Sequence, residues 1–468
     1  MDDIAPRLNL EQRLAAELQR LRAADLYRVR RAVEGGHGVA LTVDGRTCVN
    51  FCSNDYLGLA ADPRLAAAAK RALDRSGTGS GAAALVSGYN REHAQLEEEL
   101  ADFLQRPRVL LFSSGWAANL GVLRALLKRE DVLVADELNH ASLIDGGRLA
   151  GAQYVRVPHG ELGAFGRALR EARSAGREAL LVTDGVFSMD GDLADLPALS
   201  NLCEAREASL MVDDAHGFGV LGAQGRGSFE LLSHPAAPLP QLMGLCKRYG
   251  ASLMLDDAHG FGVLGQGGRG TLEHLFPSPE SRVPSPGFPD IHVATLGKSL
   301  GAAGAFVAGS ETLIEYLIQR ARSWVFSTAP PPAIAAAARE GLHILRQEPE
   351  RRAALHANIR RFRDGAAALN LGLSPSQTPI QPLVLGAEAR ALALSRHLYE
   401  RGWWVAAIRP PTVPVGTARL RITLSAAHTA AQIDGLLADL AEGMSIVGRA
   451  MPAVEPAQDS RRAQPALP

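Results

Sequence analysis

The stretch Thr295-Leu296-Gly297-Lys298-Ser299-Leu300-Gly301 places one lysine in a turn of small residues, directly after an apolar, strand-like run at 291–294. The residues that follow, up to 309, are also small and apolar, which indicates a buried region. A lysine held there loses hydration, and this favours its neutral, nucleophilic form. Such a lysine can form a Schiff base with a carbonyl cofactor. The alternative is a solvated lysine at a strand end, which is the commoner environment for this residue type.

Length and charge exclude several classes of function. A chain of 468 residues can bury a large core and is expected to form more than one domain. Its 49 Lys and Arg residues nearly balance its 50 Asp and Glu residues, so we expect neither a nucleic-acid nor a membrane partner. No apolar run is long enough to span a bilayer, and the first residues lack the basic and apolar regions typical of a signal peptide, so we expect none. The four cysteines show no C-x-x-C spacing, so we expect no metal, no disulfide framework and a cytoplasmic location.

Strand-like and helical stretches alternate between residues 109 and 189. The apolar runs 109–113, 132–135 and 179–183 each lead into small or polar residues. This pattern predicts an α/β fold with a mostly parallel, doubly wound sheet. Ligands of such sheets bind at the carboxyl ends of the strands. His140, Ser188 and Thr295 all follow predicted strands, so we expect them to converge there.

The rest of the chain suggests four regions. Asp44-Gly45 lies between two β-like runs and predicts a tight hairpin turn. The last residues are rich in proline and alanine and predict disorder. We therefore expect an N-terminal helix and hairpin segment (1–60), a large cofactor-binding domain (61–330), a smaller C-terminal α/β domain (331–446) and a tail (447–468).

An internal repeat interrupts the large domain. Residues 196–232 and 239–275 match at 24 of 37 positions, and each copy reads helix, strand, then Asp-Asp-Ala-His-Gly-Phe-Gly-Val-Leu-Gly. Two copies are too few for a solenoid. A tandem duplication of one αβ unit is the simpler explanation.

Each copy carries an aspartate and a histidine three residues apart. If the carbonyl cofactor contains a pyridine ring, a carboxylate held against the ring nitrogen keeps that nitrogen protonated, and the ring can then act as an electron sink. The histidine could contact a phenolic oxygen of the same ring. Alternatively, the aspartates cap turns and the histidines bond to the backbone. The candidate pairs are Asp213 with His216 and Asp256 with His259.

Chain continuity leads us to prefer the first copy. If the first copy is the native unit, the second copy can be explained by one insertion in a surface connection. Such an insertion costs little, because the entropy of loop closure changes slowly with loop length. Two observations oppose this preference. The second copy is nearer to Lys298 in sequence, and its strand would be an aggregation hazard if left unused.

Several motifs occur together and in order, and together they resemble the α-oxoamine synthases, pyridoxal-phosphate (PLP) enzymes of the fold-type I aminotransferase superfamily. The resemblance extends from about residue 14 to 444, with a single Asp-x-Ala-His unit in the family where this chain has two. The segment Arg409–His428 resembles the biotin-pathway branch more than its relatives. The motifs are Ser53-Asn-Asp-Tyr-Leu-Gly58, Ser114-Gly-Trp-Ala-Ala-Asn119, Asn139-His-Ala-Ser142, Asp184-Gly-Val-Phe-Ser-Met-Asp-Gly191, Asp-Asp-Ala-His-Gly and Thr295-Leu-Gly-Lys298.

The resemblance implies a role for each matching residue. Lys298 would hold PLP covalently and act in catalysis with His140, which would stack on the pyridine ring and contact substrate. Arg421 would bind the substrate carboxylate, because a planar guanidinium suits bidentate pairing. Arg28 and Thr412 would contact the acyl substrate. The remaining cofactor and phosphate contacts would come from Gly115, Trp116, Ser188 and Thr295.

The implied reaction is a PLP-dependent decarboxylative condensation of L-alanine with a pimeloyl thioester, in biotin biosynthesis, by a homodimer. The acyl carrier stays open between coenzyme A and a carrier protein. One alternative is another α-oxoamine synthase, such as a glycine C-acetyltransferase. The other is an inactive paralogue impaired by the duplication.

Overall fold

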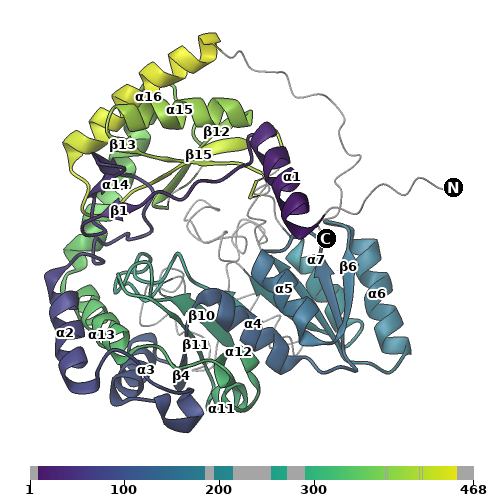
Figure 1. Cartoon of the computed structure of the whole chain (residues 1–468). Helices are drawn as coiled ribbons and strands as arrows, with labels where there is room; N and C mark the ends of the chain where they lie inside the picture. Colours follow the sequence, from purple (N-terminus) through teal and green to yellow (C-terminus); the bar gives the residue numbers. More distant parts are fainter. Residues whose placement is uncertain are drawn as a thin grey trace.

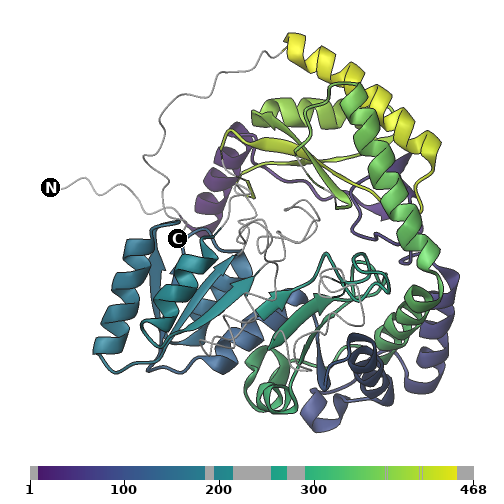
Figure 2. The same ribbon diagram turned by 180° about the vertical axis from the view of Figure 1, so that it is seen from behind.

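The computed structural model describes residues 9–184, 194–213, 254–270, 273, 290–374, 376, 378–410, 412–413 and 415–450. Within these ranges the chain forms two α/β blocks, with the C-terminal part above them in Figure 1, and one hydrophobic cluster extends through all three. From behind, the long helix α14 (Pro349–Ala368) runs from the larger blocks to the C-terminal part (Figure 2). The division into four regions stays a prediction.

One four-stranded sheet is wholly parallel, with the order β6-β5-β7-β8. Each of its strands is preceded or followed by a helix, as the alternating sequence pattern predicts. The elements of this block are β5 (Val132–Asp136), α5 (Ala141–Ala150), β6 (Gln153–Val157), α6 (Leu162–Ser174), β7 (Ala179–Asp184), α7 (Leu196–Glu204) and β8 (Ser209–Asp213).

A second four-stranded sheet is mixed, with the order β4-β11-β10-β9. Strand β9 pairs parallel with β10, whereas β11 is antiparallel to both of its neighbours. The doubly wound, mostly parallel α/β fold is therefore confirmed, with one reversed strand. The elements around this sheet are β4 (Arg108–Phe112), α4 (Gly115–Leu126), β9 (Met254–Asp256), β10 (Ile291–Thr295), β11 (Ala305–Gly309), α11 (Glu311–Arg320) and α12 (Arg322–Val325).

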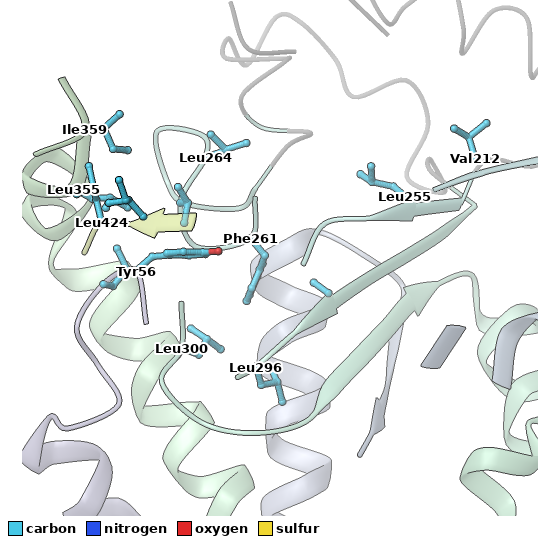
Figure 3. Packing of buried hydrophobic residues seen from close by; sticks show 14 of the residues in the cluster. Tyr56, Val212, Leu255, Phe261, Leu264, Leu296, Leu300, Leu355, Ile359 and Leu424 are labelled. Atoms are coloured by element: carbon cyan, nitrogen blue, oxygen red, sulfur yellow. The ribbon is translucent and has the colours of Figure 1, made fainter. Parts of the chain in front are cut away.

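Both faces of these sheets are buried, which explains their nearly continuous apolar strands. On β4, Val109 and Leu111 join one buried cluster, whereas Leu110 and Phe112 join another on the opposite face. The first cluster also contains Val212 of β8 and Leu255 of β9, which project from neighbouring strands in Figure 3.

The two sheets meet at β8 and β9, the strands of the two repeat copies. These strands lie in contact, but among the described residues no hydrogen-bonded ladder joins them. The sequence predicts one doubly wound sheet, and the structure instead has two half-sheets at this point. The physical reason is that the duplication supplies two strands where the sheets meet.

The N-terminal hairpin forms as predicted but joins the C-terminal part of the chain. Asp44 and Gly45 both have positive φ (50° and 75°), as a two-residue hairpin turn between twisted strands requires. The hairpin sheet has the order β1-β2-β3-β13, and β13 pairs parallel with β3. Its strands are β1 (Val33–Glu34), β2 (Ala40–Val43), β3 (Arg46–Asn50) and β13 (Trp403–Trp404).

A three-stranded antiparallel sheet with the order β12-β15-β14 forms the C-terminal block. Helix α15 packs against this sheet, and α16 packs against both α14 and α15. The elements are β12 (Ile380–Gly386), α15 (Glu388–Glu400), β14 (Ala406–Ile408), β15 (Ala418–Thr423) and α16 (Ala430–Ala450).

The remaining helices flank the mixed sheet or lie at the N-terminus. Helix α13 packs against α2 and α3. In the part of the chain that the structure describes, no helix is both long and apolar enough to span a membrane. These elements are α1 (Leu10–Ala23), α2 (Pro63–Ser76), a short π-helical turn η1 (Ala84–Gly88), α3 (Arg91–Leu104) and α13 (Pro332–Gln347).

Candidate active site

Lys298 lies in the tight turn between β10 and β11, and close packing holds this turn in place. Gly301 has φ 63°, and a Cβ there would come within 2.5 Å of the backbone of Leu59 and Ala60. The turn is also tied by a backbone hydrogen bond from Leu296 to Gly304. Desolvation lowers the pKa of Lys298 to about 8, against the opposing effect of the Asp256 carboxylate. The amine is therefore largely neutral in mildly alkaline solution, as the sequence predicts.

His259 of the second repeat copy lies directly against this amine. Its Nε2 atom is 2.8 Å from Lys298 Nζ, and its Nδ1 atom is 2.6 Å from the Tyr56 hydroxyl. Tyr56 is fully buried and reaches from its loop toward the loop that carries Phe261 (Figure 3). The Tyr56 hydroxyl also donates to Asn54 Oδ1 at 3.3 Å. The histidine ring is thus fixed from both sides, with one nitrogen facing the lysine.

Asp256 ends β9 beside this group and is buried. Its Oδ2 atom accepts a 3.2 Å hydrogen bond from Asn119 Nδ2, and its Oδ1 atom accepts one from Ala258 N at 3.0 Å. Asn119 also donates to Ser142 Oγ at 3.2 Å, which links the β9 end to the start of α5. A buried carboxylate held by neutral donors is suited to face a cation.

The contact with Lys298 contradicts our preference for the first repeat copy. Asp256 and His259 of the second copy surround the lysine, whereas Asp213 ends β8 and pairs with Asp184 of β7. The reason is that β9, and not β8, pairs with β10, the strand that leads into the Lys298 turn. Asp213 still raises the pKa of Lys298, less than Asp256 does. His216 lies outside the described residues, as does Ser188.

His140 caps the start of α5 close to this group. Its Nδ1 atom lies 2.7 Å from Ser142 Oγ, and its backbone N–H donates to the Asp184 carboxylate at 3.0 Å. Burial lowers the pKa of His140, with Asp256 acting in the opposite direction. A neutral imidazole suits the predicted stacking role, which stays a prediction.

Gly115 and Trp116 begin α4, as the sequence predicts. Ser114 caps this helix by accepting from Ala117 N at 3.1 Å, and the Trp116 ring is about half exposed. The first amides of a helix attract anions, so this end could hold a phosphate. The Thr295 hydroxyl donates to Gly304 O at 3.0 Å and accepts from Gly297 N at 3.2 Å, and its predicted cofactor contact stays a prediction.

The predicted substrate residues come from the C-terminal and N-terminal parts of the chain. Arg421 on β15 donates to Asn54 Oδ1 at 3.0 Å, and its charge helps to lower the pKa of Lys298. Arg28 donates to Thr412 Oγ1 at 2.9 Å. The structure therefore brings Arg421 to the lysine group and pairs the two predicted acyl-binding residues with each other.

Sequence reasoning assigned no role to Tyr56, Asn54 or Asn119. Their motifs were recognisable, but their contacts depend on loops that are distant in sequence. In the part of the chain that the structure describes, no cluster of His, Cys, Asp or Glu is suited to hold a metal ion.

Comparisons with known proteins identify the family of this chain. The model of the family "Aminotransferase class I and II" matches residues 46–234 and 233–440, in two segments that meet between the repeat copies. An 8-amino-7-oxononanoate synthase from Methylococcus capsulatus is 51% identical over 92% of this chain and 98% of its own length. A protein of the same name from Thioalkalivibrio sulfidiphilus is 48% identical over 92% of this chain and 97% of its own length.

Solved structures show the same fold. Serine palmitoyltransferase from S. paucimobilis, solved with bound PLP and myriocin, superimposes with a TM-score of 0.73 at 25% identity and covers 94% of this chain and 100% of that one. 8-Amino-7-oxononanoate synthase from Francisella tularensis superimposes with a TM-score of 0.58 at 29% sequence identity. This match covers 85% of this chain and 98% of that one. The chain therefore belongs to the class I and II aminotransferase family, and within it to the PLP-dependent α-oxoamine synthases.

Proposed function

We propose that this chain catalyses the decarboxylative condensation of L-alanine with a pimeloyl thioester to 8-amino-7-oxononanoate, in biotin biosynthesis. The observation that carries the proposal is the 2.8 Å contact between Lys298 Nζ and His259 Nε2, beside the buried Asp256, in a chain 51% identical to a synthase of that name. The activity, the substrates and each residue's role are part of this proposal.

The residues around Lys298 fit PLP. Lys298 offers a desolvated amine that can bond to the carbonyl carbon of PLP. Asp256 offers a buried carboxylate for the protonated ring nitrogen. His259 offers an imidazole nitrogen for the phenolic oxygen. When bound, PLP supplies an electron sink for charge that develops at the substrate's α-carbon. His140 would stack on the ring, and Gly115, Trp116, Thr295 and Ser188 would hold the remaining polar groups.

Arg421 and Lys298 perform the substrate chemistry in this proposal. Arg421 holds the alanine carboxylate, and the neutral Lys298 amine removes the α-proton. The α-carbon then bonds to the thioester carbonyl, and the thiol leaves as a thiolate that takes a proton from solvent. The former alanine carboxylate, now β to a ketone, departs as carbon dioxide, and the protonated Lys298 amine returns a proton to the α-carbon. Arg28 and Thr412 contact the acyl chain.

We also infer that the chain forms a homodimer. None of the α1 residues is buried, and Leu10, Leu14 and Leu18 form one apolar stripe along it with exposed fractions of 63%, 51% and 41%. An exposed apolar stripe is typical of a contact surface. The mass in solution, measured by light scattering, tests this. A monomer would contradict it.

The test of function is an assay with L-alanine labelled at the carboxyl carbon. With pimeloyl-CoA or a pimeloyl carrier protein, we expect free thiol, labelled carbon dioxide and 8-amino-7-oxononanoate by mass spectrometry. Faster consumption of glycine with acetyl-CoA would instead indicate a glycine C-acetyltransferase.

One structural observation favours a second candidate, an inactive PLP-binding paralogue. Among the described residues, no ladder joins β8 to β9, next to the proposed site. Spectroscopic PLP binding without thiol release in the same assay would support this alternative.

A further inference from the structure

The strands of the two repeat copies carry almost the same residues. Met211-Val212-Asp213 of β8 corresponds to Met254-Leu255-Asp256 of β9, 43 positions later. Each strand pairs on one side only: β8 with β7, and β9 with β10. Each therefore has one edge without a ladder among the described residues, and these two edges face each other.

The two ladders are in register with each other. Both are parallel, so one strand could satisfy both neighbours at once without shifting either of them. The pairs that such a strand would combine are Val182↔Met211 with Met254↔Ile291, Thr183↔Val212 with Leu255↔His292, and Asp184↔Asp213 with Asp256↔Val293.

Side-chain packing agrees with this register. Val212 and Leu255 belong to one buried cluster, and Met211 and Met254 belong to the cluster on the opposite face. Equivalent residues of the two copies thus fill the same two layers. A pocket of about 320 Å³ lies beside the two strands, is partly open to solvent, and is lined by Met211, Met254 and their neighbours. A strand with ladders on both sides satisfies more of its backbone groups than a strand paired on one side.

We propose that β8 and β9 are interchangeable occupants of one strand position between β7 and β10, and that Asp213 is a latent equivalent of Asp256. With a single copy, the strand pairs on both sides, and its terminal aspartate lies beside Lys298. The statement about Asp213 rests on the role proposed for Asp256, whereas the statement about the strands does not.

Two matched deletions of 43 residues test this. Removal of 214–256 keeps β8 and joins Asp213 to Asp257, ahead of His259. Removal of 196–238 keeps β9 instead. We expect both variants to fold, to unfold at a higher temperature than the full chain, and to bind PLP with equal affinity. In the 214–256 deletion, Asp213→Asn should weaken PLP binding, whereas in the full chain it should not. If either deletion variant fails to fold, interchangeability is wrong. If both fold but Asp213→Asn has no effect in the deletion, the latent role is wrong.

Proline substitutions test the same idea in the full chain. Proline removes a ladder N–H and is excluded from central strands. We expect Met211→Pro and Met254→Pro each to keep a cooperative unfolding transition, because the other copy fills the position, and the double variant to lose it. Loss of the transition in either single variant would overturn the proposal. These readouts do not depend on turnover, so an inactive full chain would contradict the proposed function and leave this test intact.

Discussion

The two repeat copies share nearly the same residues but end in different surroundings. Asp256, at the end of β9, accepts hydrogen bonds from Asn119 and Ala258 and lies beside Lys298. Asp213, at the end of β8, pairs in register with Asp184 of β7. The difference shows that the role of an Asp-x-x-His unit depends on which strand pairs with the strand that carries it. For the second copy that neighbour is β10, which leads into the turn with Lys298.

The largest expected effect is the loss of the lysine itself. Lys298→Ala should abolish covalent PLP attachment, measured as cofactor fixed to protein by borohydride. The chain has only four lysines, so peptide mapping can assign the site without ambiguity. The exposed Lys128 offers a matched control, and Lys128→Ala should leave attachment unchanged. Borohydride fixation at another lysine of Lys298→Ala would refute the assignment.

The comparison of copies is tested directly by Asp256→Asn and Asp213→Asn. Asp256→Asn should lower turnover by about 10²–10³-fold, because it removes the fixed negative charge proposed to stabilise the protonated ring nitrogen of PLP during the reaction. Asp213→Asn should have a small effect, since β8 does not adjoin the Lys298 turn. Steady-state rates with alanine check this. A larger loss in Asp213→Asn would restore the first copy as the working unit.

Arg421 is expected to affect mainly the binding of alanine, although its loss also removes a charge that lowers the pKa of Lys298. Removal of one partner of a buried charge pair costs about 2–5 kcal/mol, and Arg421→Ala should fall toward the lower end because the side chain is partly exposed. The measurement is the apparent affinity for alanine, with the exposed Arg396→Ala as control. An unchanged affinity would place the carboxylate site elsewhere.

The smallest effect concerns pH and distinguishes the copies most finely. Burial depresses the pKa of Lys298 to about 8, below the ordinary lysine value of about 10.4. Between pH 8 and about 10.4, Lys298 is protonated in the unfolded chain but neutral in the folded one. The free energy of unfolding therefore rises with pH across this range, and the gain is fully lost once the pH has fallen to about 8. The rate of PLP attachment to the apoprotein should likewise rise with pH and level off above about pH 8.

Both aspartates raise the pKa of Lys298, and Asp256 raises it more. Asp256→Asn should therefore move the midpoint of PLP attachment to lower pH, and Asp213→Asn should move it less in the same direction. Rapid-mixing absorbance measurements over a pH series give both midpoints. Equal shifts would mean that the two carboxylates are equally close to the lysine.

The sequence by itself determined most of the fold. Strands β4, β5, β7 and β10 begin and end within one residue of their predicted positions. Local signals explain this success. Asp62 caps α2 with Pro63 at its first position, and Asp44-Gly45 specifies a hairpin turn through its backbone angles. The lysine and its desolvation were also readable, because small apolar residues surround it in sequence.

Only the tertiary structure decided which copy meets Lys298. The residues of the two copies are equivalent, and chain continuity favoured the first, whereas the structure places His259 of the second against Lys298. The deciding fact is a parallel ladder between β9 and β10, a pairing of residues far apart in sequence that no local pattern records. The contacts of His259 with Tyr56, and of Asp256 with Asn119, are of the same kind. They arise because distant loops meet at one edge of a sheet, and that meeting is a property of packing rather than of local sequence.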